Sequence, residues 1–207
     1  DGASLITRRA HVVVTTRAGV TIVHGGKHQG SECLNDVKLI KPAIDNQGNA
    51  LPTEWREGAP LPALCRWGAA ATPLPRPGKA GKAGEDTMAV FGGRRKEKKG
   101  HHYYNELWFY HVQADEWELV KPKSGTSRPP ARDHHAMVYV AETDEIFVYG
   151  GRSAQARKKE SVLGDLWAFK VKDNRWLRMS PATQRPRARF LHTMDVWRGT
   201  FGSGNPA

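Results

Sequence analysis

The sequence has few of the features that mark secreted, membrane or disordered proteins. Cys33 and Cys65 are its two cysteines among 207 residues, too few for a disulfide framework, so we expect inert thiols in a reducing compartment, the cytoplasm or the nucleus. No segment approaches the roughly 20 consecutive apolar residues of a membrane helix. No charged and then apolar leader follows Asp1, as a signal peptide would require. With 39% hydrophobic and 26% charged residues, the composition is that of a folded chain rather than a disordered one.

Acidic residues are scarce in relation to basic ones. The chain holds 32 Lys and Arg against 21 Asp and Glu, which gives a formal net charge of +11. A surface with this excess attracts anionic partners. The composition therefore predicts an acidic protein segment or a nucleic acid as partner, and no membrane.

Three segments of the chain share the same landmarks in the same order. An apolar run ends in two glycines, a loop follows, and then come an acidic-aliphatic step and a tryptophan. Such an order, repeated three times, is a far stronger signal than any one glycine pair. The glycine pairs are Gly25-Gly26, Gly92-Gly93 and Gly150-Gly151, the acidic steps are Asp36-Val37, Glu106-Leu107 and Asp165-Leu166, and the tryptophans are Trp55, Trp117 and Trp176.

A fourth landmark precedes each glycine pair. It is an Arg-x-x-His element, at Arg8–His11, Arg132–His135 and Arg189–His192, and the second unit keeps Arg66 but has Ala69 in the histidine place. The element at Arg189 opens a fourth unit that stops before its glycine pair.

The pattern resembles the kelch repeat, whose period is about 50 residues. The resemblance covers roughly residues 7 to 200, with departures at His24, Lys38 and Ala69. It implies an all-β kelch-type β-propeller of four-stranded antiparallel blades, incomplete in this chain, with further blades or other domains outside it. The expected units are blade 1 at 7–57, blade 2 at 65–121 with an insertion at 73–86, blade 3 at 131–179, and the first strand of a fourth blade at 188–198.

Local signals agree with this architecture. Short β-branched runs such as Val12–Thr15 are typical of strands, and no amphipathic helix is evident. Each glycine pair is expected to end the second strand of its blade where a Cβ would crowd the backbone or where φ is positive. The three tryptophans are expected to fill the space between adjacent blades.

The loops that follow the glycine pairs are rich in basic residues. In a four-stranded antiparallel blade these loops lie on the same face as the links between blades, so the sequence predicts one positive face around a mouth lined by the repeated arginines. Several guanidinium groups close together suit carboxylates or phosphates. The predicted partner-binding residues are Arg8, Arg66, Arg132, Arg189, Arg94, Arg95, Lys96, Lys98, Lys99, Arg152, Arg157, Lys158 and Lys159.

Each of these residues also has a purely structural or generic interpretation. The repeated arginines are also compatible with a mainly structural role in bonding one blade to the next, since they belong to the repeat itself. The basic loops are compatible with solvated, solubilising segments. The run Arg94–Lys99 is also compatible with a nuclear localisation signal.

The resemblance implies a non-enzymatic protein-interaction scaffold or substrate-receptor module that holds an acidic partner segment on its basic face. The alternative is an RNA-binding scaffold of a ribonucleoprotein complex, in which Tyr103 and Tyr104 would stack on bases. The first interpretation needs a protein partner that resists nuclease, whereas the second needs RNA.

Catalytic, metal and cofactor sites are not predicted. His101 and His102 are adjacent in a loop, and His134 and His135 would point to opposite faces of a strand. A kelch-type oxidase would need tyrosine and histidine ligands for copper, and nothing in the sequence marks such a set. We therefore expect that the protein is not an enzyme.

Overall fold

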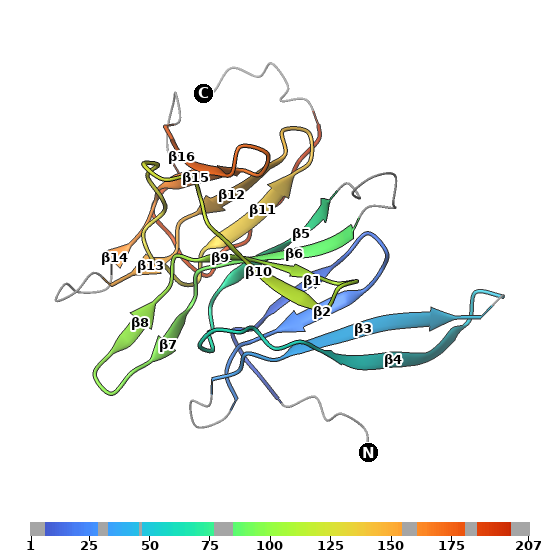
Figure 1. Cartoon of the computed structure of the whole chain (residues 1–207). Coiled ribbons are helices and arrows are strands. Elements are labelled where there is room, and N and C mark those ends of the chain that lie inside the picture. Colours follow the sequence, from blue (N-terminus) through green and yellow to red (C-terminus); the bar gives the residue numbers. More distant parts are fainter. Residues whose placement is uncertain are drawn as a thin grey trace.

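The computed structural model describes residues 7–28, 33–45, 47–76, 85–154, 161–180 and 186–199. Strands form three four-stranded antiparallel sheets and two short two-stranded ribbons, and the described ranges contain no helix (Figure 1). The predicted all-β fold of four-stranded antiparallel blades is confirmed. A helix long and apolar enough to cross a membrane is absent from the described ranges.

Each four-stranded sheet is one blade, in which the strands pair in chain order. Blade 1 holds β1 (Val12–Thr15), β2 (Thr21–His24), β3 (Val37–Ile44) and β4 (Ala50–Gly58). Blade 2 holds β5 (Ala70–Arg76), β6 (Glu85–Phe91), β9 (Leu107–His111) and β10 (Glu116–Val120). Blade 3 holds β11 (Ala136–Val140), β12 (Glu145–Tyr149), β15 (Leu166–Lys170) and β16 (Arg175–Met179).

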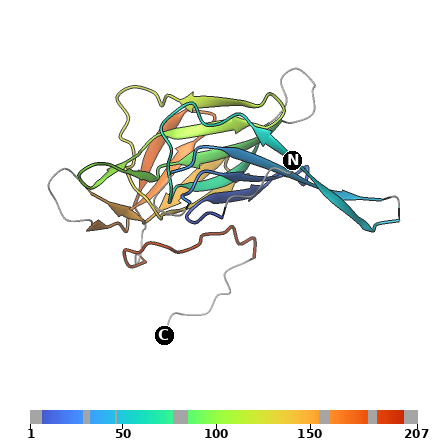
Figure 2. The same cartoon turned by 90° about the horizontal axis from the view of Figure 1, so that it is seen from below.

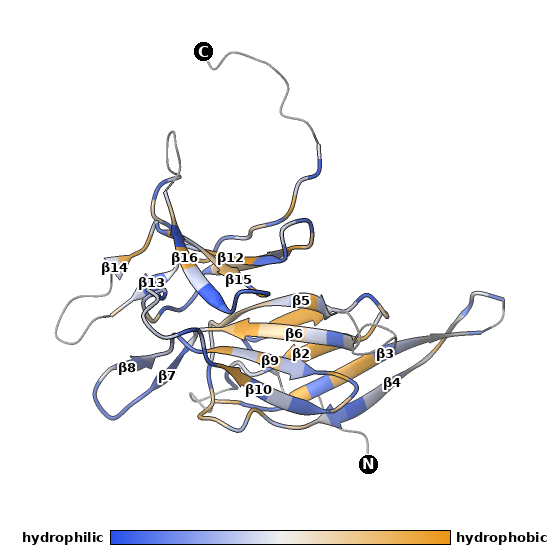
Figure 3. Ribbon diagram, turned by 45° about the horizontal axis from the view of Figure 1, so that its top comes forward, coloured by the Kyte–Doolittle hydropathy of each residue, from blue (hydrophilic) through white to orange (hydrophobic). Residues whose placement is uncertain are grey.

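The inner strands of each blade are apolar and the outer strands are polar. Met88, Val90 and Phe91 of β6 are fully buried, which a strand covered on both faces requires. Hydropathy follows the same order across the sheets: β2 and β6 are mainly apolar, whereas long parts of β4 and β10 are hydrophilic (Figure 3). The core therefore lies in the middle of the blades and between them.

Two hydrophobic clusters join neighbouring blades. One combines Val14 and Ile22 of blade 1 with Met88 and Tyr110 of blade 2. The other combines residues of blades 2 and 3, among them Phe91, Phe109, Met137, Val148 and Trp176. Because a single sheet of this kind cannot cover both of its faces, each blade depends on its neighbours for burial.

Tryptophans close the two boundaries between blades. Trp117 of blade 2 lies 4.9 Å from the ring of His24 in blade 1, and Trp176 of blade 3 lies 5.1 Å from the ring of Phe91 in blade 2. Each tryptophan thus covers the aromatic residue that precedes the glycine pair of the preceding blade. Trp55 of blade 1 has no preceding blade among the described residues, and 39% of its surface is exposed.

The glycine pairs meet both expected requirements. Gly92 and Gly93 have φ of 69° and 90°, a region that side chains with a Cβ rarely adopt. A Cβ on Gly92 would also lie 2.7 Å from the carbonyl oxygen of Arg132. The glycine pair therefore allows the next blade's inner strand to approach this backbone closely.

Strands extend into the ends of the insertion predicted at 73–86, whose residues 77–84 lie outside the described ranges. The segment Lys41–Thr53 prolongs β3 and β4 into a long hairpin, and β5 and β6 extend into the predicted insertion at 73–86 as far as Arg76 and Glu85. The segment 188–198 forms no strand; residues 186–199 run along the edge of the stacked sheets without joining one (Figure 2).

The loops after the second and third glycine pairs form small ribbons. One consists of β7 (Arg94–Lys96) and β8 (His101–Tyr103), and the other of β13 (Arg152–Ser153) and β14 (Ser161–Val162). Both ribbons project from the side of the molecule opposite to the tip of the β3–β4 hairpin (Figure 1). The basic loops and the long hairpin therefore lie at different ends of the blades.

The two cysteines form a disulfide, so the expectation of free, inert thiols is wrong. Cys33 and Cys65 have Cα atoms 5.5 Å apart although 32 positions separate them in the sequence. The bond joins the loop after the first glycine pair to the link that precedes blade 2. Two strands lie between the cysteines, so sequence spacing alone did not indicate that they meet. The bond also removes the argument for a reducing compartment.

We expect the same substitution to have different effects on stability at Trp176 and at Trp55, because the two side chains differ in burial. Trp176 is 2% exposed and Trp55 is 39% exposed. We expect Trp176→Ala to lower the free energy of unfolding by about 3 to 5 kcal/mol, and Trp55→Ala to lower it by less than about 1 kcal/mol. Urea unfolding followed by circular dichroism measures both. Equal losses in the two variants would contradict the assigned packing role.

Candidate functional site

The repeated arginines are bonded inside their own blades. The guanidinium of Arg132 donates to both carboxylate oxygens of Asp165 at 2.9 and 2.8 Å and to the carbonyl of Gly150 at 2.9 Å. Arg8 does the same with Asp36 and the Gly25 carbonyl. Arg66 donates to one oxygen of Glu106 at 2.9 Å and to the Gly92 carbonyl at 3.3 Å. We name this arrangement the arginine clamp. It ties the first strand, the glycine pair and the acidic step of one repeat together.

The clamps leave little of these arginines for a partner. The side chains of Arg66 and Arg132 are 0% exposed and that of Arg8 is 4% exposed. The predicted mouth lined by the repeated arginines is therefore not formed by these three, because their side chains are buried and their Nη groups donate within the blade. Arg189 differs: it is exposed, and its side chain donates to the carbonyl of Arg187.

The clamps keep the acidic residues ionised. Burial alone would raise the pKa of Asp165, but the hydrogen bonds and charge of Arg132 hold that pKa below its usual value. Burial would likewise raise the pKa of Asp36, but the hydrogen bonds and charge of Arg8 lower it, so the pKa is again below its usual value. A buried arginine with an ionised partner is stable, whereas either charge left alone would be costly.

Histidines complete the boundaries between blades. The ring of His135 packs edge-on against Phe91 at 5.4 Å, and a Cβ on Gly92 would lie 2.8 Å from it. Burial lowers the pKa of His135 to about 3 and that of His24 to about 4. His24 Nδ1 donates to the carbonyl of Asp36 at 2.9 Å. Both rings are therefore neutral in the folded protein near pH 7.

The structure brings the inter-blade links and the loops after the glycine pairs to one face. Short antiparallel bridges join Arg9 to Lys27, Trp67 to Arg94, and Asp133 to Arg152. In each pair the first residue directly follows a clamp arginine and the second directly follows a glycine pair. This placement agrees with the topological argument from the sequence.

Three basic groups at this face form ion pairs with the carboxylate of Asp133. Its side chain is 0% exposed, and Arg94 Nε, Arg152 Nη2 and His134 Nδ1 lie 2.9, 3.2 and 2.6 Å from its carboxylate. Burial alone would raise the pKa of Asp133, but the hydrogen bonds and charges of these groups hold it below its usual value. Two predicted partner-binding arginines, Arg94 and Arg152, are thus partly neutralised, and they connect blades 2 and 3.

A second group of basic residues is compensated only at Arg94, which pairs with Asp133. Lys27 Nζ lies 4.9 Å above the ring of Trp67, and the Arg94 guanidinium lies 5.8 Å from the same ring. Desolvation, followed by repulsion from Arg9, Arg94 and Lys96, lowers the pKa of Lys27. We name Arg9, Lys27, Arg94 and Lys96 the Trp67 cation cluster. In the described ranges no carboxylate pairs with Arg9, Lys27 or Lys96.

The other predicted residues lie around this cluster or outside the described ranges. Arg95 pairs with Glu97 at 2.8 Å, and Lys98 and Lys99 are exposed at the turn between β7 and β8. The predicted residues Arg157, Lys158 and Lys159 lie outside the described ranges.

Sequence reasoning missed Arg9 and Trp67 as members of this face. The signal that could have found them is position, since each directly follows a clamp arginine in its repeat. Tyr103 and Tyr104, which the RNA hypothesis needs for stacking, are 7% and 6% exposed.

The sequence comparison decides the family. Residues 78–202, more than half of the chain, match the KLHDC2/KLHL20/DRC7 Kelch-repeats domain. The chain belongs to the kelch-repeat family. The arginine clamps and the glycine pairs described above are therefore features of kelch blades in this chain.

Curated relatives match a larger part of this chain, up to 91% of it. The mouse protein named multiple epidermal growth factor-like domains protein 8 is 28% identical over 195 residues, which cover 91% of this chain and 6% of that protein. Dynein regulatory complex subunit 7 of Chlamydomonas reinhardtii is 26% identical over 55% of the chain and 9% of its own length. Kelch repeat-containing protein 2 of Saccharomyces cerevisiae is 25% identical over 61% and 14%. The chain thus spans only a small part of each relative.

The solved structure of YjhT has the same fold. It superposes with a TM-score of 0.57 at 15% sequence identity, covering 86% of this chain and 54% of YjhT. At this identity the likeness shows the kelch propeller fold alone, and the chain corresponds to about half of that propeller.

The fold match corrects the expectation that the protein is not an enzyme. That expectation treated a kelch propeller without a visible ligand set as a binding module. The fold shared with YjhT is not restricted to binding modules, because one fold hosts both catalysis and binding. The expectation that the protein is not an enzyme is therefore wrong. Within the described ranges, no three His, Cys, Asp or Glu side chains are grouped so that they could hold a metal ion.

The buried histidines predict that the kelch blades lose stability in mild acid. Their pKa is near 6.5 in the unfolded chain and lower in the fold, so unfolding takes up protons as the pH falls below 6.5. The stability is fully present above pH 6.5 and decreases toward the folded pKa of about 4 for His24.

Blade 2 supplies the matched substitution, because Phe91 stands in the place of His24. Between pH 7.5 and 4.5, we expect His24→Phe to lose about 2 to 3 kcal/mol less stability than the unsubstituted chain. Urea unfolding at a series of pH values measures this difference. Identical pH profiles would show that His24 is not held neutral by burial.

Proposed function

We propose that this kelch segment is a protein-interaction module that binds an acidic segment of a partner protein at the Trp67 cation cluster and the adjoining β7–β8 ribbon. The kelch-repeat relatives support the coarser statement of a protein-interaction module. The position of Lys27 supports the finer one, because its Nζ lies 4.9 Å above the Trp67 ring and its backbone bridges to Arg9. Desolvation, followed by repulsion from Arg9, Arg94 and Lys96, lowers the pKa of Lys27, which agrees with a concentration of positive charge there.

The electrostatic argument separates this cluster from an ordinary solvated loop. Basic residues in a solvated loop spread apart, whereas Lys27 is held over Trp67 and Arg94 is held by Asp133. An acidic ligand would relieve the repulsion within the cluster, and the fixed positions reduce the entropy lost on binding. Lys98 and Lys99 at the exposed turn would extend the contact and guide the approach of the ligand.

RNA is the competing ligand class for the same charge. Base recognition needs exposed aromatic rings, and the two tyrosines beside the ribbon are buried. We therefore favour the acidic protein segment and treat RNA as an outcome of the test.

The disulfide bears on where this binding takes place. Cys33–Cys65 lies directly beside Lys27, which bridges to Cys33, so the bond supports the loop that carries part of the cluster. Disulfides persist in oxidising compartments. We therefore propose an oxidising compartment as the site of action in place of the cytoplasm.

Charge reversal tests the proposal. We expect the combined variant Lys27→Glu, Lys96→Glu and Lys98→Glu to bind a fluorescent decaglutamate peptide about tenfold or more weakly than the unsubstituted chain, because it converts attraction into repulsion. Fluorescence anisotropy at 50 and 200 mM salt measures the affinity, and binding by the unsubstituted chain should weaken with salt.

The matched control reverses three exposed basic residues away from the cluster, Arg17, Lys41 and Lys172. It carries the same net charge as the test variant and should keep most of the affinity. If both variants lost the same amount of affinity, the effect would come from net charge alone, and the proposed site would be rejected. Tighter binding of a ten-nucleotide uridine RNA than of the peptide would favour the RNA alternative.

A further inference from the structure

The disulfide joins the two halves of the Trp67 cation cluster. Lys27 is bridged to Arg9 on one side and to Cys33 on the other. Trp67, over which the Lys27 ammonium is held, follows Cys65 by two positions. The bond between Cys33 and Cys65 therefore fixes the segment beside Lys27 to the link that carries Trp67.

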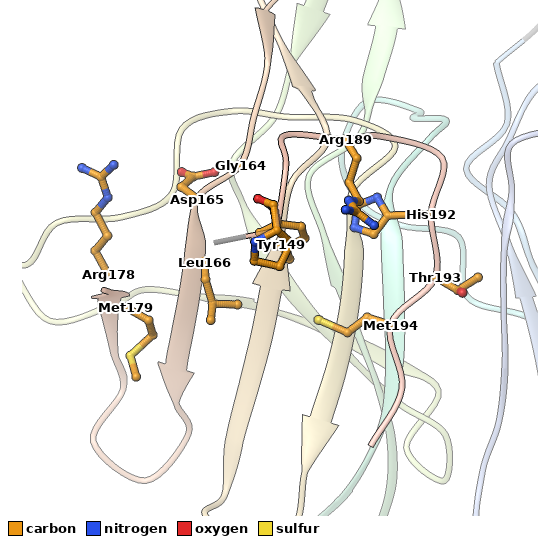
Figure 4. A pocket seen from close by; sticks show the side chains of 11 residues that line it. Tyr149, Gly164, Asp165, Leu166, Arg178, Met179, Arg189, His192, Thr193 and Met194 are labelled. Atoms are coloured by element: carbon orange, nitrogen blue, oxygen red, sulfur yellow. The ribbon is translucent and has the colours of Figure 1, made fainter. Parts of the chain in front are cut away.

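The links that open the third and fourth units are tied to the preceding loops by hydrogen bonds. The amide of Arg132 donates to the carbonyl of Tyr104 at 3.0 Å, and the amide of Arg189 donates to the carbonyl of Leu163 at 3.1 Å. Figure 4 shows the second of these links, with Arg189 at the edge of the pocket beside Tyr149. The same backbone contact thus joins loop and link at both places.

At the link that opens blade 2, the disulfide takes the place of this contact. Leu34 and Arg66 hold the corresponding positions in the repeat, directly after Cys33 and Cys65. Among the residues that the structure describes, no backbone hydrogen bond joins Leu34 to Arg66. A covalent bond that a reductant can open therefore stands where the other links have a hydrogen bond.

The remaining contacts of blade 1 do not depend on the disulfide. The amide of Leu61 donates to the Asn35 carbonyl at 2.9 Å, and Asn35 Nδ2 donates to the Leu61 carbonyl at 3.2 Å. The clamp between Arg8 and Asp36 involves neither cysteine. Opening of the disulfide should therefore free the segment beside Lys27 locally, while the blade stays folded.

The position of the two cysteines suits attack by an external thiolate. Each cysteine is half-buried rather than part of the core. Exchange releases one of the two sulfurs as a thiolate. Lys27 lies directly opposite Cys33 in the bridge, so this side of the disulfide carries positive charge.

We propose that Cys33–Cys65 is a redox-active site that controls how tightly the Trp67 cation cluster binds an acidic segment. A dithiol reductant, such as a protein with two neighbouring thiols, forms a mixed disulfide with one sulfur and then closes its own disulfide. Two electrons and two protons pass from the reductant to Cys33 and Cys65, which become thiols. This inference rests on the proposed function, because the acidic segment is the ligand whose affinity changes.

The two redox forms differ in order rather than in charge, since a disulfide and a thiol are both uncharged. In the oxidised form, Lys27 is held over the Trp67 ring beside the other cations of the cluster. In the reduced form, the segment beside Lys27 is less constrained, so an acidic ligand must order it on binding. That ordering costs conformational entropy, and the reduced form binds more weakly.

Binding of fluorescent decaglutamate, measured by anisotropy, tests the redox control. We expect the chain reduced with dithiothreitol to bind about fivefold or more weakly than the oxidised chain, at the lower end of typical couplings between two sites. The double variant Cys33→Ser and Cys65→Ser should bind like the reduced chain, and dithiothreitol should not change its affinity. Equal affinity of the oxidised and reduced chains would overturn the redox control and leave the binding site standing. Absence of binding by both forms would reject the proposed function and the redox control together, so the two failures are distinguishable.

Hydrogen exchange gives a second measurement that needs no ligand. The amides of Lys27 and Leu34 are hydrogen-bonded beside the disulfide, and they should lose protection when the chain is reduced. The amide of Arg152, which donates to the Asp133 carbonyl at 2.9 Å, is the matched control and should keep its protection. Unchanged exchange at Lys27 and Leu34 would overturn the proposal. An equal loss of protection at Arg152 would also overturn it, because the whole molecule would then be unfolding.

Discussion

The buried arginine of each repeat is the interaction on which the rest of the structure depends. Its guanidinium holds the acidic residue at the start of the third strand and the carbonyl of the first glycine in the pair. Three segments distant in the sequence are thereby fixed at one point. The lowered pKa of Asp165 and Asp36 shows that the pair stays charged within the fold. Without the carboxylate, an isolated buried guanidinium would be strongly unfavourable.

The glycine pair is as necessary for this geometry as the arginine clamp. The clamp brings the inner strand of the next blade against the glycine backbone, at a distance where no Cβ fits. This close approach aligns the aromatic residue before the glycines with the histidine and tryptophan of the next blade. Polar clamps inside each blade thus set the geometry of the apolar contacts between blades, and the apolar contacts supply most of the buried surface.

The same organisation divides the basic residues into two classes. Arginines inside the clamps serve the fold, since their side chains are buried and their Nη groups donate to residues of their own blade. Residues one position after the clamp arginine meet residues one position after a glycine pair across short bridges, which join Arg9 to Lys27, Trp67 to Arg94 and Asp133 to Arg152. Asp133 compensates this charge between blades 2 and 3, whereas Arg9 and Lys27 of blade 1 lie beside Trp67 without a carboxylate. Part of the excess positive charge is therefore gathered beside Trp67.

The sequence by itself determined the fold class, because the repeated order of arginine, glycine pair, acidic step and tryptophan is a local pattern in the chain. It also determined that the links and the glycine loops share a face, since that follows from the direction of four antiparallel strands. Tertiary structure alone showed which of the repeated arginines are buried, because Arg66 lies inside its blade and donates to Glu106, whereas Arg189 is exposed and donates to the carbonyl of Arg187. It likewise decided the pairing of Cys33 with Cys65 and the place of Trp67 under Lys27, since both contacts join residues that the blades bring together over long separations.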